Sequence, residues 1–162
     1  MSEAQPAIGF ATIDDVPDLA RLRWELYAEQ EGGLPETADA YRDRFEPFAR
    51  TALASEDWRA WVARTDDRLV GAMWLQTVHR VPVPGKRAGP IGYLTNVYVA
   101  PEHRGRGLGA RMLGHVTAWC REQRYSCVIT WPTARSRPFY RRGGFDRLDE
   151  PFIVDLVRDD PL

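Results

Sequence analysis

The feature that most limits how this 162-residue chain can fold is a strand that passes through a glycine-rich bend into a helix. Residues 91–100 are apolar or aromatic on both faces, which is typical of a central strand, and Pro101 ends that strand. Glycines in the bend at residues 104–110 allow backbone N–H groups to converge at the start of a helix, where the helix dipole favours negative charge. The segment therefore predicts an anion site, to which Arg104 and Arg106 add positive charge.

Composition narrows the class of protein. With 44% hydrophobic and 28% charged residues, the chain fits a single globular domain over residues 1–162, with enough core to fold without disulfides or metals. A net charge of -1 disfavours nucleic-acid binding by phosphate neutralisation. No secretory signal and no stretch of transmembrane length is present, so we expect a cytoplasmic protein with no membrane partner. Cys120 and Cys127 lack metal-ligand spacing, so we expect both to be buried apolar residues and we expect no metal site.

Hydrophobic periodicity predicts a mixed α/β (α+β) sheet flanked by helices. The predicted strands cover residues 8–11, 58–64, 69–78, 91–100, 126–131, 145–148 and 152–157. The predicted helices begin near Val16, cover residues 37–54 with Pro47 as a kink or boundary, follow the glycine bend, and cover residues 135–142. Only the two later helices make crossovers between parallel strands. We therefore expect about seven strands and about four helices, in a mostly antiparallel sheet whose late change of direction opens a crevice for a ligand.

The glycine bend has several possible functions, and its surroundings reduce their number. Gly105-x-Gly107-x-x-Ala110 formally fits a dinucleotide-binding fingerprint, but that site needs the first strand of a βαβ unit and an acidic residue about 20 positions later. The next strand instead ends at Trp131-Pro132 without an acid. A phosphate loop of the Gly-Lys-Ser/Thr type is absent, and a plain tight turn remains the structural alternative.

A second motif, at residues 136–145, makes the assignment specific. The segment Arg104–Gly109 (R-x-x-G-x-G) resembles the acetyl-coenzyme A (acetyl-CoA) signature of the GNAT N-acetyltransferases, and Phe139–Phe145 (F-Y-x-x-G-G-F) resembles a later segment of that family. The resemblance extends over residues 58–145 in the order of elements. It implies a GNAT-like fold and an enzyme that moves an acetyl group from acetyl-CoA to an amine by direct attack in a ternary complex.

The resemblance also implies roles for individual residues. The bend would hold the coenzyme A pyrophosphate through backbone N–H groups, the preceding strand would pair with the pantetheine arm, and Tyr140 would protonate the departing thiolate. The implied coenzyme-binding residues are Val97, Tyr98, Val99, Arg104, Gly105, Arg106, Gly107, Leu108, Gly109, Ala110 and Ser136. Tyr140 could instead serve only to pack beside Phe139 and Phe145. Thr133 and Ser136 depart from the asparagine and alanine common in the family, which weakens any assignment of side-chain contacts to pantetheine.

The sequence does not identify the general base or the acceptor amine. Groups that could carry the proton of the amine are Glu25, Glu29, Glu31, Asn96, Tyr98, His79 and His103, although solvated surface positions explain the glutamates and histidines equally well, and His115 is expected on a helix surface. Aromatic residues that could line the acceptor pocket are Trp24, Tyr27, Tyr41 and Trp74, with the loop at residues 81–90.

We expect a small-molecule or peptide amine as the partner, and acidic residues in the first two helices would suit a cationic one. The rival functions are a non-catalytic sensor or regulatory module that binds acyl-CoA, and a nucleotide-binding regulatory domain. The oligomeric state is open, with a homodimer as one alternative.

Overall fold

The computed structural model describes residues 5–66, 68–86 and 89–146. It separates into two compact units, Met1–Trp131 and Pro132–Leu162. The strands of the first unit are β1 (Ala7–Phe10), β2 (Trp58–Arg64), β3 (Leu69–Val78), β4 (Ile91–Val99) and β5 (Cys127–Ile129). Its helices are α1 (Val16–Glu31), α2 (Ala38–Ala54) and α3 (Leu108–Glu122), with short 3-10 turns η1 (Ile13–Asp15) and η2 (Pro101–His103). The second unit contains α4 (Arg137–Arg142). The expected single domain stays a prediction.

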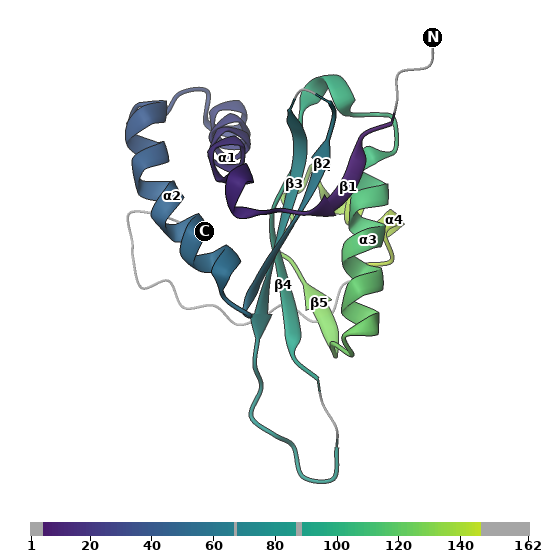
Figure 1. The fold of residues 1–162 in the computed structure, drawn as a ribbon. Helices are drawn as coiled ribbons and strands as arrows, with labels where there is room; N and C mark the ends of the chain where they lie inside the picture. The colour runs from purple at the N-terminus through teal and green to yellow at the C-terminus, as the bar shows by residue number, and fades with distance from the viewer. Residues whose placement is uncertain (1–4, 67, 87–88, 147–162) are drawn as a thin grey trace. The chain divides into compact units, whose positions relative to one another are not determined.

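The sheet of the first unit changes direction once. Its strands lie in the order β1-β2-β3-β4-β5, and the first four pair antiparallel (Figure 1). The last pair is parallel and short, because β5 pairs only with residues 91–93 of β4. The predicted antiparallel start and late parallel pairing are therefore confirmed, and the remaining length of β4 is paired only with β3 among the described strands.

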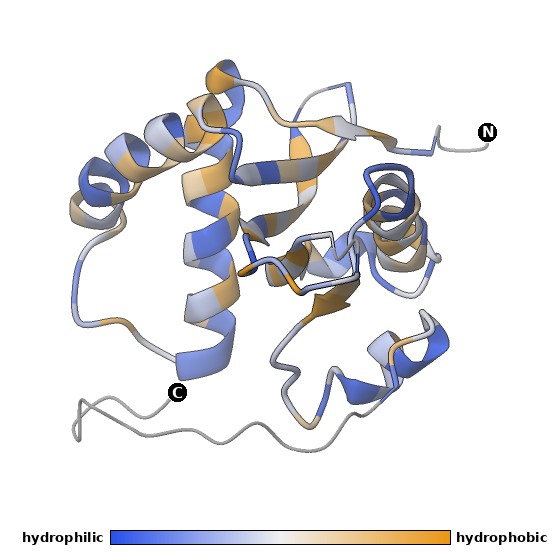
Figure 2. Ribbon diagram, turned by 90° about the horizontal axis from the view of Figure 1, so that it is seen from below, coloured by the Kyte–Doolittle hydropathy of each residue, from blue (hydrophilic) through white to orange (hydrophobic). Residues whose placement is uncertain are grey.

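Helices cover both faces of this sheet. In Figure 1, α1 and α2 lie together on one face and α3 on the other. An apolar stripe of the sequence forms the buried side of α3, where Leu108, Met112 and Val116 are buried and Trp119 is half-buried. The β3 segment 69–75 is buried without interruption, as a strand covered on both faces should be. The leucine, valine and methionine side chains of this segment each contribute about 1.5–3 kcal/mol when they are fully removed from water. Along the helices hydrophobic residues alternate with hydrophilic ones (Figure 2), so each helix buries one side only.

Local sequence sets the helix ends on the first face. Gly32, with φ of 67°, ends α1 in the left-handed conformation that glycine adopts without strain. The Thr37 side chain accepts a hydrogen bond from the Ala40 N–H and so caps the start of α2. Pro47 lies inside α2 and is not a boundary, because the same helix presents buried Phe45 and Ala49 to the sheet on either side of it.

Several expectations differ from the structure in extent. The strand predicted at 126–131 is only three residues long, and the last helix begins two residues later than expected. Of the two expected final strands, residues 145 and 146 have no regular structure and the others lie outside the described residues. The described sheet therefore has five strands where about seven were expected.

Cysteine burial was predicted correctly at only one of the two positions. Cys120 is buried in α3, and burial raises the pKa of its thiol to about 11, so this thiol stays protonated at neutral pH. Cys127 is exposed, which corrects the expectation for that residue. It is the first residue of the short strand β5, which is the last strand of the described sheet, where side chains lose the cover of neighbouring elements.

A search of the described ranges finds no helix with the length and apolar character needed to cross a bilayer. The same ranges contain no group of three or more histidine, cysteine or acidic side chains arranged to hold a metal ion.

Candidate functional site

The second half of β4 presents a backbone edge that β5 leaves unpaired. The Ala100 N–H donates to the Val70 carbonyl at 2.9 Å, so Ala100 faces β3. Because backbone groups alternate along a strand, the N–H and C=O groups of Val99 and Val97 point to the opposite edge, where β5 has already ended. An extended ligand could add there as a further strand. Both valine side chains are half-buried, so packing and binding roles are compatible at these positions.

A bulge bends β4 just before this edge. The register between β3 and β4 shifts from Ala72 opposite Tyr98 to Trp74 opposite Thr95, so β4 holds one extra residue. Asn96 adopts the left-handed region with φ of 52°, which asparagine tolerates better than most residues. Its Oδ1 accepts a hydrogen bond of 2.8 Å from Arg23 Nη1 in α1. The bulge was not predicted from the sequence. The only signal for it there is Asn96 itself, because asparagine tolerates the left-handed conformation.

The glycine bend forms the N-terminal end of α3. Gly105 and Gly107 have φ of 74° and 77°, and both are exposed. Gly107 is the N-cap, so no side chain caps the helix, and the first backbone amide with a helical partner is that of Arg111, which donates to the Gly107 carbonyl at 3.0 Å. The amides of residues 108–110 therefore lack intrahelical acceptors. This arrangement suits an anion placed at the helix start.

Arg104 is bound to the protein instead of pointing freely into the bend. Its Nη atoms donate to both carboxylate oxygens of Glu29 at 2.7 Å, and its Nε donates to the Val99 carbonyl at 2.7 Å. The hydrogen bond to Glu29 raises the pKa of Arg104, whose guanidinium also lies 5.4 Å from the Tyr98 ring centroid. Arg104 therefore connects the bend to the last turn of α1 and to β4, while Arg106, on the bend itself, is exposed.

Tyr98 lies under this arginine and is buried. Burial, together with the charge of nearby Glu25, raises the pKa of the Tyr98 phenol. The side chain is therefore a neutral phenol at physiological pH, and a proton acceptor for an amine has to be sought elsewhere.

The other groups considered as proton carriers are distributed over the first unit. Glu25 pairs with Arg21 at 2.8 Å, and Glu31 is exposed at the end of α1. His79 is exposed and its Nε2 bonds to Asp57 at 2.8 Å. His103 is half-buried in η2, and His115 lies on the exposed surface of α3 as expected. Glu29 is committed to Arg104, so the structure does not single out a base.

Aromatic side chains from α1, α2, β2 and β3 form a continuous series, which we call the aromatic wall. Its members are Trp24, Tyr41, Phe45, Phe48, Trp58 and Trp74, with neighbouring ring centroids 5.6–6.3 Å apart. Of the residues predicted to line the acceptor pocket, three belong to the wall. Tyr27 instead stacks on Arg23, whose guanidinium lies 4.5 Å from its ring centroid. The indole N–H of Trp74 is buried without a hydrogen-bond acceptor in the described chain, surrounded by aromatic faces that accept only weakly.

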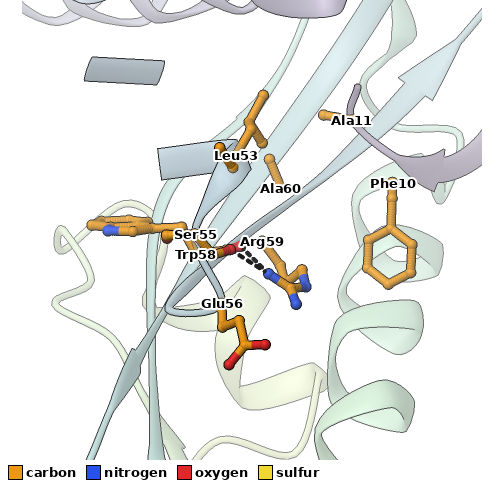
Figure 3. Close-up of a pocket in the computed structure, with 9 residues that line it drawn as sticks. Phe10, Ala11, Leu53, Ser55, Glu56, Trp58, Arg59 and Ala60 are labelled. Atoms are coloured by element: carbon orange, nitrogen blue, oxygen red, sulfur yellow. Dashed lines mark hydrogen bonds between the residues drawn. The ribbon is translucent and has the colours of Figure 1, made fainter. Parts of the chain in front are cut away.

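Two hollows open beside the end of α2. The larger, about 360 Å³, is lined by the ends of β1 and α2 and the start of β2, and contains no predicted site residue (Figure 3). In it, the Arg59 guanidinium donates to the carbonyls of Ser55 and Trp58 at 2.9 and 2.7 Å, so its charge is turned toward the backbone. The smaller hollow, about 260 Å³, shares Ser55 and Trp58 with the larger one and is also lined by Phe48, Asp57 and Gln76.

The second unit contains the other predicted site residues. Ser136 and Thr133 form a turn ahead of α4, in which the Ser136 N–H and hydroxyl both donate to the Thr133 carbonyl at 3.1 and 3.2 Å. Tyr140 is buried, and its ring contacts Phe139 and Phe145 with centroids 5.0 and 5.5 Å apart. The packing alternative for Tyr140 is thus realised within this unit. A chemical role is compatible with it, since packing fixes the direction of the hydroxyl.

Comparison with known proteins places the chain in a class. The model of the acetyltransferase (GNAT) family matches residues 16–145. The chain belongs to this family and is an acyltransferase. It is 30% identical over 122 residues to aminoglycoside N(6')-acetyltransferase type 1 of Stenotrophomonas maltophilia, covering 75% of this chain and 72% of the relative.

Solved structures show the same fold. A predicted acetyltransferase from Clostridium acetobutylicum with acetyl-CoA matches with a TM-score of 0.78 and 22% identity, covering 93% of this chain and 96% of the other. A GCN5-related N-acetyltransferase from Ralstonia eutropha JMP134 matches with a TM-score of 0.75 and 25% identity, covering 92% of this chain and 97% of the other. The expected GNAT-like fold is confirmed.

Proposed function

We propose that this protein transfers an acetyl group from acetyl-CoA to a cationic small-molecule amine. The observation that carries the proposal is the uncapped start of α3 behind Gly107, together with the edge of β4 that no described strand covers. An anion at the helix start and an extended arm along the strand are the two chemical parts of coenzyme A that such a surface would bind. The Clostridium protein, whose structure was solved with acetyl-CoA, and the Stenotrophomonas relative, which is named for an aminoglycoside, support this direction.

Individual residues would have separate roles in the proposed acetyl transfer. The amides of residues 108–110 hold the pyrophosphate, and the outward backbone groups of Val97 with the Val99 N–H hold the arm, which supplies an activated thioester, while the Val99 carbonyl stays bound to Arg104. The amine nitrogen bonds to the thioester carbon, the carbon–sulfur bond breaks, and the sulfur keeps the electron pair. Tyr140 donates the proton that converts the thiolate to a thiol, and the outward strand N–H of Val97 stabilises the charge that develops on oxygen. The amine loses its own proton to a base or to ordered water.

The proposal is tested by release of free thiol from acetyl-CoA in the presence of a panel of amines, with calorimetric binding of coenzyme A, NAD and ATP alongside. We expect thiol release that depends on the amine and equals the acetylated product. Coenzyme A binding without turnover of any amine would favour the non-catalytic sensor. Tight NAD or ATP binding without coenzyme A binding would overturn the assignment of the bend.

Replacing Glu29 separates a base from a structural partner of Arg104. Because both carboxylate oxygens of Glu29 accept hydrogen bonds from Arg104, we expect Glu29→Gln to keep kcat and the shape of its pH profile within about twofold of wild type. Loss of a general base costs about a hundredfold or more. The measurement is kcat against pH for the wild type, Glu29→Gln and the exposed control Glu31→Gln. A hundredfold loss confined to Glu29→Gln would identify Glu29 as the base.

A further inference from the structure

The smaller hollow combines aromatic walls with a carboxylate. It lies between α2 and the open end of the β2–β3 hairpin, where β2 begins and β3 approaches its end, and its volume is about 260 Å³. Phe48 and Trp58 form one corner, with rings that meet edge to face at 5.7 Å between centroids. Phe48 is 49% exposed although it is a large apolar residue, so its ring is available to a ligand. Asp57 and Gln76 supply the polar groups of the lining.

This lining selects positive charge. The Asp57 Oδ1 is hydrogen-bonded to His79 Nε2, which orients the carboxylate and leaves its Oδ2 with no partner among the described residues. A carboxylate that shares a lining with tryptophan and phenylalanine rings attracts an ammonium group through charge, and the ring quadrupoles add to this attraction where the ammonium meets a ring face. The Gln76 amide oxygen adds a neutral acceptor for an ammonium N–H. An anionic group would instead be repelled by Asp57.

The hollow is connected to the candidate active site through the aromatic wall. The ring centroids of Trp58 and Trp74 lie 6.1 Å apart, and the wall continues through Phe45 and Tyr41 to Trp24 in α1. Gln76 pairs with Tyr93, which precedes the bulge residue Asn96 by three positions on β4. At 3.3 Å per residue, the hollow lies about 10 Å along the strand from the bulge.

We propose that the hollow at Asp57, Phe48, Trp58 and Gln76 binds a second ammonium group of the acceptor. The inference rests on the proposed function and deepens it by naming the substrate class. Preferred acceptors are di- or polyamines in which a non-reacting ammonium group lies about 10 Å from the reacting amine. Phe45 and Trp74 are buried inside the aromatic wall, so the carbon chain or rings between the two nitrogens would lie over its exposed and half-buried members.

The test compares a diamine with its monoamine counterpart. We expect Asp57→Asn to lower kcat/KM for diaminooctane about fivefold, because the variant loses one partly exposed contact to a cation. The kcat/KM for octylamine should stay within about twofold of the wild-type value. Glu56→Gln is the matched control, because it removes the same charge one residue away, where Glu56 lines the other hollow (Figure 3). Equal losses for the two variants, or equal losses for the two amines with Asp57→Asn, would overturn the inference.

A binding measurement makes the result independent of turnover. Calorimetry of diaminooctane with the whole chain, without acetyl-CoA, should give a Kd about fivefold weaker for Asp57→Asn and a stronger affinity for Gln76→Glu, which adds a second carboxylate to the hollow. If no amine is acetylated but these differences hold, the proposed function fails and the ammonium site stands. If turnover is observed but the Kd values of all three proteins agree, the ammonium site is wrong and the proposed function stands.

Discussion

Tyr140→Phe lowers kcat by about a hundredfold and leaves the Kd of coenzyme A unchanged, if the phenol is the acid that protonates the departing thiolate. The substitution removes one oxygen and keeps the ring, which is packed between Phe139 and Phe145. Packing in α4 is therefore retained while the proton donor is lost. Steady-state kinetics with the best amine of the panel, together with calorimetry of coenzyme A, provides both measurements.

The control for Tyr140 is Phe145→Leu, which perturbs the same aromatic contact and keeps the hydroxyl. We expect this variant to lower the melting temperature with a far smaller effect on kcat. A loss of kcat as large as that of Tyr140→Phe would show that the tyrosine acts through packing. Unchanged turnover in Tyr140→Phe would remove the residue from the mechanism altogether.

Gly107→Val weakens coenzyme A binding by about tenfold or more. An added Cβ at Gly107 meets no atom within 4 Å, so the cost comes from the backbone alone. A β-branched residue at a φ of 77° is strained by about 1–2 kcal/mol or more, and relief of that strain turns the amides at the start of α3 away from their common point. Calorimetric Kd values for coenzyme A measure the effect.

Gly114→Val is the matched control for this substitution. Gly114 lies in the same helix, is exposed, also has open space around an added Cβ, and has ordinary helical backbone geometry. We expect the control to bind coenzyme A with wild-type affinity. Wild-type affinity in Gly107→Val would mean that the anion is held elsewhere.

The parts of the fold that follow local sequence rules were predictable. The hairpin of β2 and β3 follows from alternation around a short polar turn, and α3 follows from an apolar stripe that begins directly after Gly107. The change from antiparallel to parallel pairing follows from the long helical connection between β4 and β5, since parallel neighbours need a crossover. Each of these signals lies within one contiguous segment.

The parts that depend on contacts between distant segments were not predictable. The bulge at Asn96 depends on the register with β3 and on Arg23, which is 73 positions away. Glu29 was considered as a base and Arg104 as a ligand of phosphate, but these residues, 75 positions apart, bind each other. Two side chains of opposite charge carry no sequence signal that assigns them as partners, because many other pairs in this chain are equally complementary.

The ion pair of Arg104 and Glu29 has a consequence for how strongly two ligands bind together. It joins the glycine bend to α1, and α1 also carries Trp24 of the aromatic wall and Arg23, which bonds to the bulge residue Asn96. Any rearrangement of this pair by a ligand at the bend changes the affinity for a ligand at α1 by some factor. Thermodynamic reciprocity requires the second ligand to change the affinity of the first by the same factor. Two substrates that meet at β4 would thus change each other's affinity for the protein before any bond between them forms.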